Sequence, residues 1–534
     1  MHQSARSMSA GAIRATFFVA IAIAVAMQVY SWGGPIRGGY RIVAVPVKPT
    51  GATAQLTVVE RDRTSRRWTA WDTDGDGTWD EFTTLRDNFT RPGLRTPPKR
   101  WLVVCLDGVP LGEMQSLWDR GHFREFFRPT ATVSTLPSDT ETAMTEVLHA
   151  KPVPGYEHVY FDRGENRIRG GFWITLTGFG IPYVHVLDYD TPGWAKIVHF
   201  VVTRKAYRAD VGRFRDDFLA SSAPVFLAHI AASDGLLHVD KLETAEPLLS
   251  EFENALSEIY FQAHGDLGLI VFSDHGNTET PSRAAHVETF LAQRGWQIRE
   301  SVRGPRDVAI PSYGLVAFAA IYCRPEAIET IAENLRAIEG ADVIVSRLAN
   351  GSVDGGANLE ARIRAAASPA TADLAWSPDG RKYRYTAHDG DPLGLVPVFD
   401  SLRAAGKLDA NGFASDADLF AATSLAAFPD SAARIRAWTM NQVRNPADIL
   451  LSFKPGYYHG IESFRHIVNL AGTHGGLERS GSLGFVMATY PLPPATRLSD
   501  LIPANLLPRL QNAELARHVD FPQATPSEQP SPLY

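Results

Sequence analysis

The sequence contains only two cysteines among its 534 residues, Cys105 and Cys323. Both lie within apolar, strand-like runs, which suits small buried side chains better than a disulfide bridge. Basic runs of the kind that bind nucleic acid are also lacking, and the formal net charge is -7. We therefore expect no nucleic-acid polymer as a partner. What the chain does have is 45% hydrophobic residues, which is ample for a large core.

Residues 1–32 have the pattern of an export segment. Arg6 and Arg14 come first without a neighbouring acid, and Ala15–Trp32 is an apolar run. The small residues of Ala24–Ala26 fit a signal peptidase site. The run is also about long enough to span a membrane. Export with cleavage is the favoured interpretation, and tethering to the membrane by an uncleaved helix is the alternative.

Residues 33–98 are predicted to form a small β-rich region. Strands are expected at Trp68–Trp71 and Trp79–Thr83, and the turn between them has acids at alternate positions. These acids are Asp72, Asp74, Asp76 and Asp80. Side-chain oxygens so spaced around glycines resemble a calcium loop, although Thr83 stands where the helix-loop-helix version needs a bidentate glutamate. A calcium site and an acidic β-turn are both open interpretations.

Three apolar runs of strand length are followed by polar groups. They are Trp101–Leu106 before Asp107, Pro224–Ile230 before Asp234 and His238, and Leu267–Phe272 before Asp274 and His275. Apolar runs without alternation are typical of strands buried on both faces of a parallel sheet. Ligands bind just beyond the carboxyl ends of such strands. The amphipathic segment Leu242–Tyr260 joins two of these runs into a right-handed βαβ unit, so the sequence predicts an α/β fold.

Two further polar residues follow strand-like or glycine-rich segments. Thr140 comes after the β-branched stretch Thr130–Leu136 and lies close to the expected start of a helix, which favours either a bound anion or an N-cap. His474 lies in the glycine-lined turn Gly472–Gly476. Together the candidates comprise three carboxylates, three imidazoles and one hydroxyl. Such a set suits hard-to-borderline divalent cations.

The order of these motifs resembles the alkaline phosphatase superfamily, in particular its type I phosphodiesterase and nucleotide pyrophosphatase branch. The matching motifs are Leu106-Asp107-Gly108, Pro137-Ser138-Asp139-Thr140, Gly155-Tyr156-Glu157-His158, the pair Asp234 and His238, Ser273-Asp274-His275-Gly276, and Gly472-Thr473-His474-Gly475. The resemblance covers about residues 99–508 and leaves 509–534 as a tail. It implies a mostly parallel central sheet flanked by helices. Residues 350–440, which are rich in Gly and Ala, are then an irregular insertion or cap.

The resemblance also implies a site with two divalent metal ions, for which zinc is expected. One ion would be held by Asp234, His238 and His474, and the other by Asp107, Asp274, His275 and the oxygen of Thr140. Coordination is a standard way to activate a hydroxyl, so Thr140 would attack phosphorus and form a phospho-threonine intermediate. Glu141–Ala143 stands where the family often has Phe-Pro-Asn or Pro-Pro-Asn. No asparagine is available there to contact the phosphoryl oxygens, so other residues must take over part of substrate binding. A shifted alignment would instead make Thr135 the nucleophile.

The sequence thus predicts a periplasmic or extracellular metal-dependent hydrolase of phosphoric esters, with a small-molecule phosphoester as its substrate. A diesterase is favoured over a monoesterase, and a sulfatase is disfavoured because the nucleophile is Thr rather than Cys or Ser. A phosphotransferase to an envelope alcohol and a non-catalytic binding protein are the alternatives. Specificity is expected to lie in the insertion and in loops such as Tyr383–Pro392 and Lys454–His459.

Overall fold

The structure of the chain is a computed structural model. It describes residues 53–59, 65–84, 87–91, 98–200, 202–240, 242–264, 266–278, 283–348, 353–354, 357–440, 442–461, 470–503 and 506. The predicted export segment at 1–32 and the tail at 509–534 lie outside the described residues, so both stay predictions. Within the described ranges, no helix has the length and apolar character needed to cross a bilayer.

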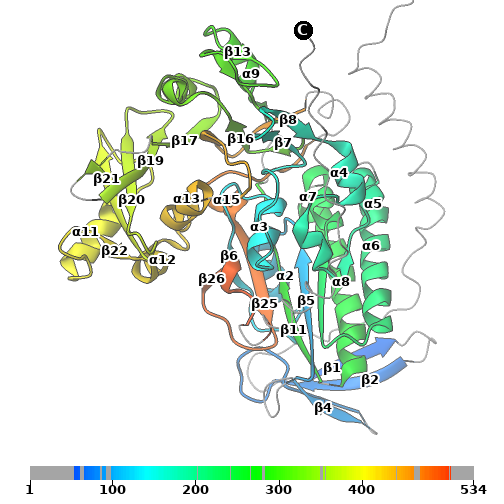
Figure 1. Cartoon of the computed structure of the whole chain (residues 1–534). Helices are drawn as coiled ribbons and strands as arrows, with labels where there is room; N and C mark the ends of the chain where they lie inside the picture. The colour runs from blue at the N-terminus through cyan, green and yellow to red at the C-terminus, as the bar shows by residue number, and fades with distance from the viewer. Residues whose placement is uncertain are drawn as a thin grey trace, which may run out of the picture.

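A mixed sheet forms the core of the molecule (Figure 1). Among the described residues its strands are, in spatial order, β26 (Ala495–Arg497), β6 (Thr130–Val133), β25 (Leu483–Ala488), β11 (Leu267–Phe272), β5 (Arg100–Leu106), β10 (Val225–Ile230) and β9 (Tyr189–Asp190). Strand β5 pairs in parallel with both β10 and β11. Strand β25 runs antiparallel between β6 and β11, so a late segment of the chain fills the middle of the sheet. The prediction of an α/β fold with a mostly parallel sheet is confirmed.

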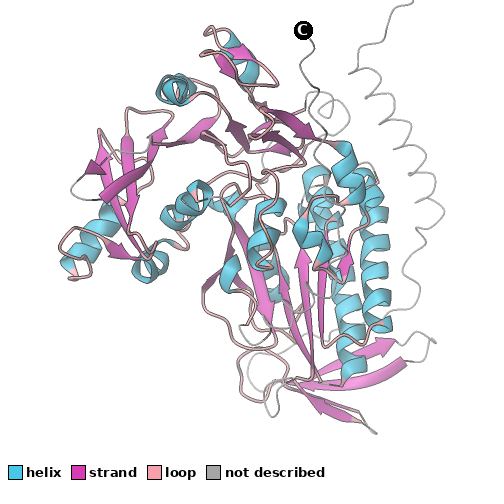
Figure 2. Cartoon of the chain, viewed as in Figure 1, coloured by secondary structure: helices cyan, strands magenta, loops and turns pink. Residues whose placement is uncertain are grey.

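Helices cover both faces of this sheet, as Figure 2 shows by colour. They are α2 (Leu111–Asp119), α3 (Thr140–Val147), α4 (Phe172–Thr177), α5 (Gly193–Val198), α6 (Thr203–Ala220), α7 (Ala232–Val239) and α8 (Leu242–Ala263), with the short helix η1 (Pro182–His185). Side chains of β5 alternate between the layers. Leu102 and Val104 pack with residues of α2, α6 and α8, whereas Val103 and Cys105 pack with those of α3. Burial on both faces explains why this strand is apolar throughout.

A second, antiparallel sheet lies beside the central one (Figure 1). Its strands are β16 (Phe318–Ile321), β23 (Ile449–Phe453), β17 (Ala341–Arg347), β19 (Ala357–Ala365), β20 (Thr371–Trp376), β21 (Lys382–His388) and β22 (Ala414–Ser415), and β18 (Val353–Asp354) pairs with β19. It is accompanied by α10 (Ile328–Leu335), α11 (Val396–Ala404), α12 (Asp416–Thr423) and α13 (Ser431–Thr439). The expectation of irregular structure at 350–440 is therefore wrong, because small residues such as Ala372 and Ala375 pack inside regular strands. Whether 350–440 is a separable cap stays a prediction.

The N-terminal strands form a separate sheet at the end of the central sheet away from α3 and α7 (Figure 1). They are β1 (Thr53–Val59), β2 (Ser65–Trp71), β3 (Glu81–Thr83) and β4 (Asn88–Thr90), all antiparallel. Phe82 and Phe89 pack edge-to-face against Tyr260 and Phe261 at the end of α8. The prediction that a strand begins at Trp79 is wrong by two residues, because Trp79 and Asp80 still belong to the acidic turn.

Short elements complete the described fold. They are β7 (Val159–Asp162), β8 (Arg167–Gly170), β12 (Arg283–Ala284), β13 (Gln297–Ile298), β14 (Asp307–Val308), β15 (Leu315–Val316), β24 (Tyr457–Gly460), α9 (Val287–Ala292), α15 (Arg479–Ser482), η2 (Pro325–Ala327) and η3 (Leu498–Asp500). Cys105 and Cys323 are both buried and form no disulfide.

Candidate metal centre

The ends of three adjacent parallel strands bring the predicted acids and imidazoles to one edge of the central sheet. Asp107 follows β5, and Asp274 and His275 follow β11. Strand β10 leads into α7, which presents Asp234 and His238 one helical turn apart. Because β10, β5 and β11 are neighbours that run in the same direction, their carboxyl ends meet at this edge.

Thr140 is the first residue of α3, and the N-cap is Asp139, whose carboxylate accepts from the backbone N–H of Glu141. The N-cap interpretation of Thr140 is therefore wrong, because the preceding residue fills that position. Thr140 Oγ1 lies 3.4 Å from both carboxylate oxygens of Asp107 and 3.4 Å from Nε2 of His275. Thr135 has a different environment: its buried hydroxyl donates to the carbonyl of Pro137, 2.8 Å away.

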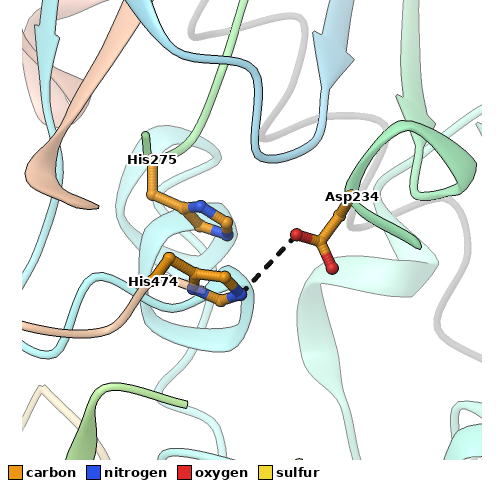
Figure 3. A group of neighbouring side chains, drawn as sticks. All are labelled: Asp234, His275 and His474. Carbon is orange, nitrogen blue, oxygen red and sulfur yellow. Dashed lines mark ion pairs between the residues drawn. The ribbon is translucent and has the colours of Figure 1, made fainter. Parts of the chain in front are cut away.

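Asp234 is the meeting point of two imidazoles. Its Oδ1 lies 3.2 Å from Nε2 of His238 and 3.6 Å from Nε2 of His474. Figure 3 shows Asp234 facing His474, with His275 beside it. The rings of His275 and His474 stack with centroids 3.7 Å apart. His474 reaches this position from a turn in which Gly475 has a φ of +111°, a conformation that only glycine adopts readily.

The ligand atoms form two overlapping groups, each with the spacing of a metal site. One group contains Asp107, Asp274 and His275, and the other contains Asp234, His275 and His474. His275 thus belongs to both groups. The predicted partition placed His275 with one ion only and His238 with the other. In the structure His238 approaches the second group through Asp234 Oδ1.

The orientation of the histidine rings fits metal ligation. Nδ1 of His238, His275 and His474 hydrogen-bonds a backbone carbonyl in each case, at 2.8, 2.9 and 2.8 Å. Each Nδ1 can therefore donate to a carbonyl, which directs each Nε2 into the site, where it becomes a ligand once its proton is displaced. In addition, buried Asp234 Oδ1 and Asp274 Oδ2 have no hydrogen-bond donor. Orphaned carboxylate oxygens beside ring nitrogens that can give up a proton are what a divalent cation requires, so the residues present fit such a group.

Electrostatics in the site follow from the crowding of buried charges. Burial opposes ionisation of Asp107, but hydrogen bonds from His229 and His275 hold the pKa of its carboxyl well below the usual value. Burial and the Asp107 carboxylate raise the pKa of Asp274 to about 7. Burial and the neighbouring His275 lower the pKa of His474 to about 3, which keeps this imidazole neutral. A bound cation would relieve the repulsion between the two carboxylates.

A cavity of about 180 Å³ opens onto these groups. Asp107, Thr140 and Asp234 line its floor, and Phe200 and Tyr313 are among the residues of its walls. None of the described residues in the predicted specificity loops Tyr383–Pro392 and Lys454–His459 lines it. That expectation is wrong because these loops belong to the second sheet and to β24, whereas the wall comes from α4, α5 and neighbouring segments.

Several residues of the site were missed in the sequence. His229 of β10 bridges two carboxylates, with Nε2 3.0 Å from Asp107 and Nδ1 2.8 Å from Asp190. Burial disfavours its charged form, but both carboxylates together raise its pKa to about 10, so it is an imidazolium. Lys196 in turn donates to Asp190 over 2.8 Å and also lines the cavity. The available signal was a lone imidazole within an otherwise apolar strand.

The Glu141 carboxylate, next to Thr140, also faces the cavity. It forms an ion pair with Nε2 of His158 at 2.8 Å. Nδ1 of His158 hydrogen-bonds Thr175 of α4 at 2.8 Å, and Thr175 hydrogen-bonds Tyr313. This network links the residue next to Thr140 to α4 and to the wall of the cavity.

The acidic turn of the N-terminal sheet brings three of its four predicted ligands together, namely Asp72, Asp74 and Asp80. Asp76 instead accepts from the backbone N–H and the hydroxyl of Thr78. Asp80 is buried and ion-paired with Arg91 at 2.9 Å. Calcium at this turn stays a prediction.

Comparison with family models found no match to the chain, and comparison with curated proteins found none either. Among solved structures, phosphonoacetate hydrolase from Sinorhizobium meliloti 1021 is similar at 12% identity and a TM-score of 0.41, over 82% of this chain and 98% of the other. Murine ectonucleotide pyrophosphatase/phosphodiesterase 5 is similar at 12% identity and a TM-score of 0.42, over 77% and 95%. Both are members of the alkaline phosphatase superfamily. Likeness to that superfamily at these scores assigns no activity, so function is inferred below from the residues of this chain.

Proposed function

We propose that the protein is a metal-dependent hydrolase of phosphoric esters that uses Thr140 as its nucleophile. The observation that carries the proposal is the position of the Thr140 hydroxyl. It lies at the N-terminus of α3, 3.4 Å from Asp107 and His275, and it opens onto the cavity. A helix N-terminus favours the negative charge of a phosphoryl group, and the strand-end ligands surround the atom that would attack.

The chain's own residues support each part of this role. The Asp107 carboxylate accepts the hydrogen bond of the Thr140 hydroxyl and is itself held by His229. It is therefore within reach as an acceptor for the proton that must leave when the Thr140 oxygen bonds to phosphorus. The ester oxygen then departs with its organic group. Water breaks the resulting phospho-threonine bond in a second step and regenerates the hydroxyl.

Two divalent ions, with zinc the expected metal, would fit the two overlapping ligand groups. When bound they would supply Lewis-acid stabilisation of the attacking and leaving oxygens. Asp107, Asp274 and His275 would hold the ion on the side of Thr140. Asp234, His238 and His474 would hold the other, with His275 close to both.

The cavity favours esters that carry an organic group. Its walls include apolar Phe200 and Ile197 next to the charged Lys196. A volume of about 180 Å³ has room for a phosphoryl group and part of an organic substituent, but not for a polymer. We infer a small-molecule phosphodiester as the substrate. The apolar segment Ala15–Trp32 supports export, with the enzyme either released into the periplasm or medium or tethered to the membrane.

The proposal is tested with Thr140→Ala, Thr140→Ser and Thr135→Ala, assayed on a panel of phosphodiesters and phosphomonoesters. We expect Thr140→Ala to lower turnover by at least ~1,000-fold, because the nucleophile is lost. Thr140→Ser keeps a hydroxyl and should retain part of the activity. Thr135→Ala should remain active, since its hydroxyl faces Pro137. Normal turnover by Thr140→Ala would exclude the proposal, and transfer to an added alcohol would identify a phosphotransferase.

A further inference from the structure

Arg434 on α13 is a buried cation whose partners are mostly backbone carbonyls. It is 4% exposed. Nε and Nη2 donate to the carbonyl of Thr135 at 3.1 and 2.7 Å, and Nη2 also donates to Ser138 Oγ at 2.9 Å. Nη1 donates to the carbonyls of Pro429 and Leu477, both at 3.1 Å. All five N–H groups of the guanidinium are thus used, and among the described residues no carboxylate hydrogen-bonds it.

Three of these four partners belong to the two loops that carry the site, and the fourth, Pro429, lies just before α13. Thr135 and Ser138 precede Thr140, and Leu477 follows His474. Ser138 also joins the loops directly, because its carbonyl accepts from Nδ1 of His474 at 2.8 Å. Its Oγ donates to the carbonyl of Gly476 at 3.0 Å. Arg434 therefore contacts the residue that orients His474 and the segment that leads into the nucleophile.

A charge at this position is unfavourable for stability alone. Burial lowers the pKa of Arg434 to about 10, but the group stays charged at neutral pH. Asp430 and Glu478 attract this charge, but neither carboxylate hydrogen-bonds it. A desolvated charge held mostly by carbonyls is usually less stable than an apolar side chain of similar volume. What the guanidinium adds is a rigid, planar set of donors that fixes several carbonyls at once.

We propose that Arg434 is a positioning residue that sets the distance between Thr140 and His474. This inference rests on the proposed function. It also makes the region of the second sheet part of the catalytic unit, because Figure 1 shows α13 between that sheet and α15. Displacing a reacting group by about 1 Å can lower turnover by roughly 100-fold, even when the change lies away from the chemistry.

The test uses Arg434→Met and Arg434→Lys in the full chain, with Arg436→Met as the matched control. A second cavity of about 210 Å³ borders both Arg434 and Arg436. Arg436 lies on the same helix as Arg434, but among the described residues it donates to neither loop. We expect Arg434→Met to lower kcat by about 100-fold with KM within about threefold. Arg434→Lys should recover only part of the loss, because one ammonium cannot span the carbonyls of Thr135 and Leu477. Arg436→Met should keep kcat within about twofold of the unchanged protein.

Two readouts separate positioning from general destabilisation. The second cavity borders Arg434, so added methylguanidinium has a route to the space left in Arg434→Ala. It should raise kcat of that variant at least about tenfold, because the restored donors would return the two loops to their original positions. Zinc titration of Arg434→Met should show one of two equivalents bound at least about tenfold more weakly, because Ser138 no longer fixes His474.

Opposite results would overturn the inference. They are unchanged kcat and zinc binding in Arg434→Met, or equal losses in Arg434→Met and Arg436→Met. If Arg434→Met does not fold, Arg434→Lys and the methylguanidinium experiment decide. An unchanged protein that hydrolyses no ester would count against the proposed function alone. The zinc titration would then still decide whether Arg434 positions the His474 loop.

Discussion

The molecule contains two clusters of acidic residues that the sequence suggests as cation sites, and the structure shows that their surroundings differ. At the strand ends, Asp234 and Asp274 each keep a buried carboxylate oxygen without a donor. In the N-terminal turn, Asp72 accepts from the backbone N–H groups of Gly75 and Gly77 at 2.7 and 2.9 Å. In the first cluster imidazoles lie next to these open oxygens. In the second, Asp80 Oδ1 also lacks a hydrogen bond, but the Arg91 guanidinium pairs with it at 2.9 Å.

The positive charges differ in the same way. Asp80 of the turn is paired with the buried guanidinium of Arg91, so a cation there must compete with Arg91. At the strand ends the neighbours are imidazoles, which can become neutral and ligate through Nε2. Alternating acids alone therefore do not identify a metal site. What distinguishes one is an open carboxylate oxygen next to groups that can themselves ligate a cation, rather than next to a guanidinium.

The largest difference between the two clusters should appear in their effect on catalysis. Asp234→Ala removes the carboxylate shared by His238 and His474, so phosphodiester turnover should fall at least ~1,000-fold, given that metal stabilisation is worth several kcal/mol. Asp74→Ala removes an acid of the turn and should leave turnover within about twofold. The measurement is kcat/KM on the best substrate of the panel. Equal losses in both variants would remove the functional distinction between the clusters.

Metal removal should affect only the strand-end cluster. A strong chelator should abolish turnover, and zinc should restore it, since neutral imidazoles with carboxylates suit zinc better than calcium. Elemental analysis should give two zinc ions in the restored protein. We expect His275→Ala to lower the occupancy of both positions, because His275 belongs to both ligand groups. Loss of a single ion would instead favour the partition predicted from the sequence.

The turn should matter for stability. Asp80→Ala leaves Arg91 buried without its ion pair and should destabilise the folded state by about 3 kcal/mol. Urea unfolding measures this loss, which we expect to be the same with and without calcium. The matched control is Asp76→Ala, whose carboxylate is exposed and bonds only Thr78. A loss for Asp80→Ala that appears only when calcium is present would make the turn a genuine calcium site.

Calcium binding to the turn should give the smallest effect. Because Asp80 is engaged by Arg91, we expect a Kd no tighter than about 1 mM, as in weak extracellular calcium sites. At 1 mM calcium the stabilisation would then be at most about 0.4 kcal/mol. Thermal unfolding with magnesium as the control checks this value. A clearly larger shift with calcium alone would contradict the expected difference between the two clusters.

Much of the central sheet could be predicted because its strands are buried on both faces. The strands β5, β10 and β11 are continuous apolar runs, and their ends carry the acids and imidazoles of the site. The strands of the second sheet between 350 and 440 were missed because they contain many small or charged residues. Arg362 and Asp373, for example, pair across β19 and β20, and no apolar run marks these strands.

The supporting residues of the site could not be predicted for a different reason. His229 lies inside a strand, and its function depends on Asp190, which is 39 positions away in sequence. Arg434 is 299 positions from Thr135, and its partner there is a backbone carbonyl that any residue could provide. Side-chain patterns reveal ligand types, but they contain no information about which carbonyls a distant guanidinium will meet.

Strand β25 has a consequence for how the protein is made. It is inserted between β6 and β11, although more than 200 residues separate it in sequence from each of these two strands. During translation, Asp107, Thr140, Asp234 and Asp274 are synthesised long before His474 and β25, the strand that fills the middle of the sheet. The nascent chain therefore has no complete pair of ligand groups until synthesis is nearly finished. Under the proposed function, activity and full metal capture would be late events in biogenesis, and a chain truncated before β25 is expected to be inert.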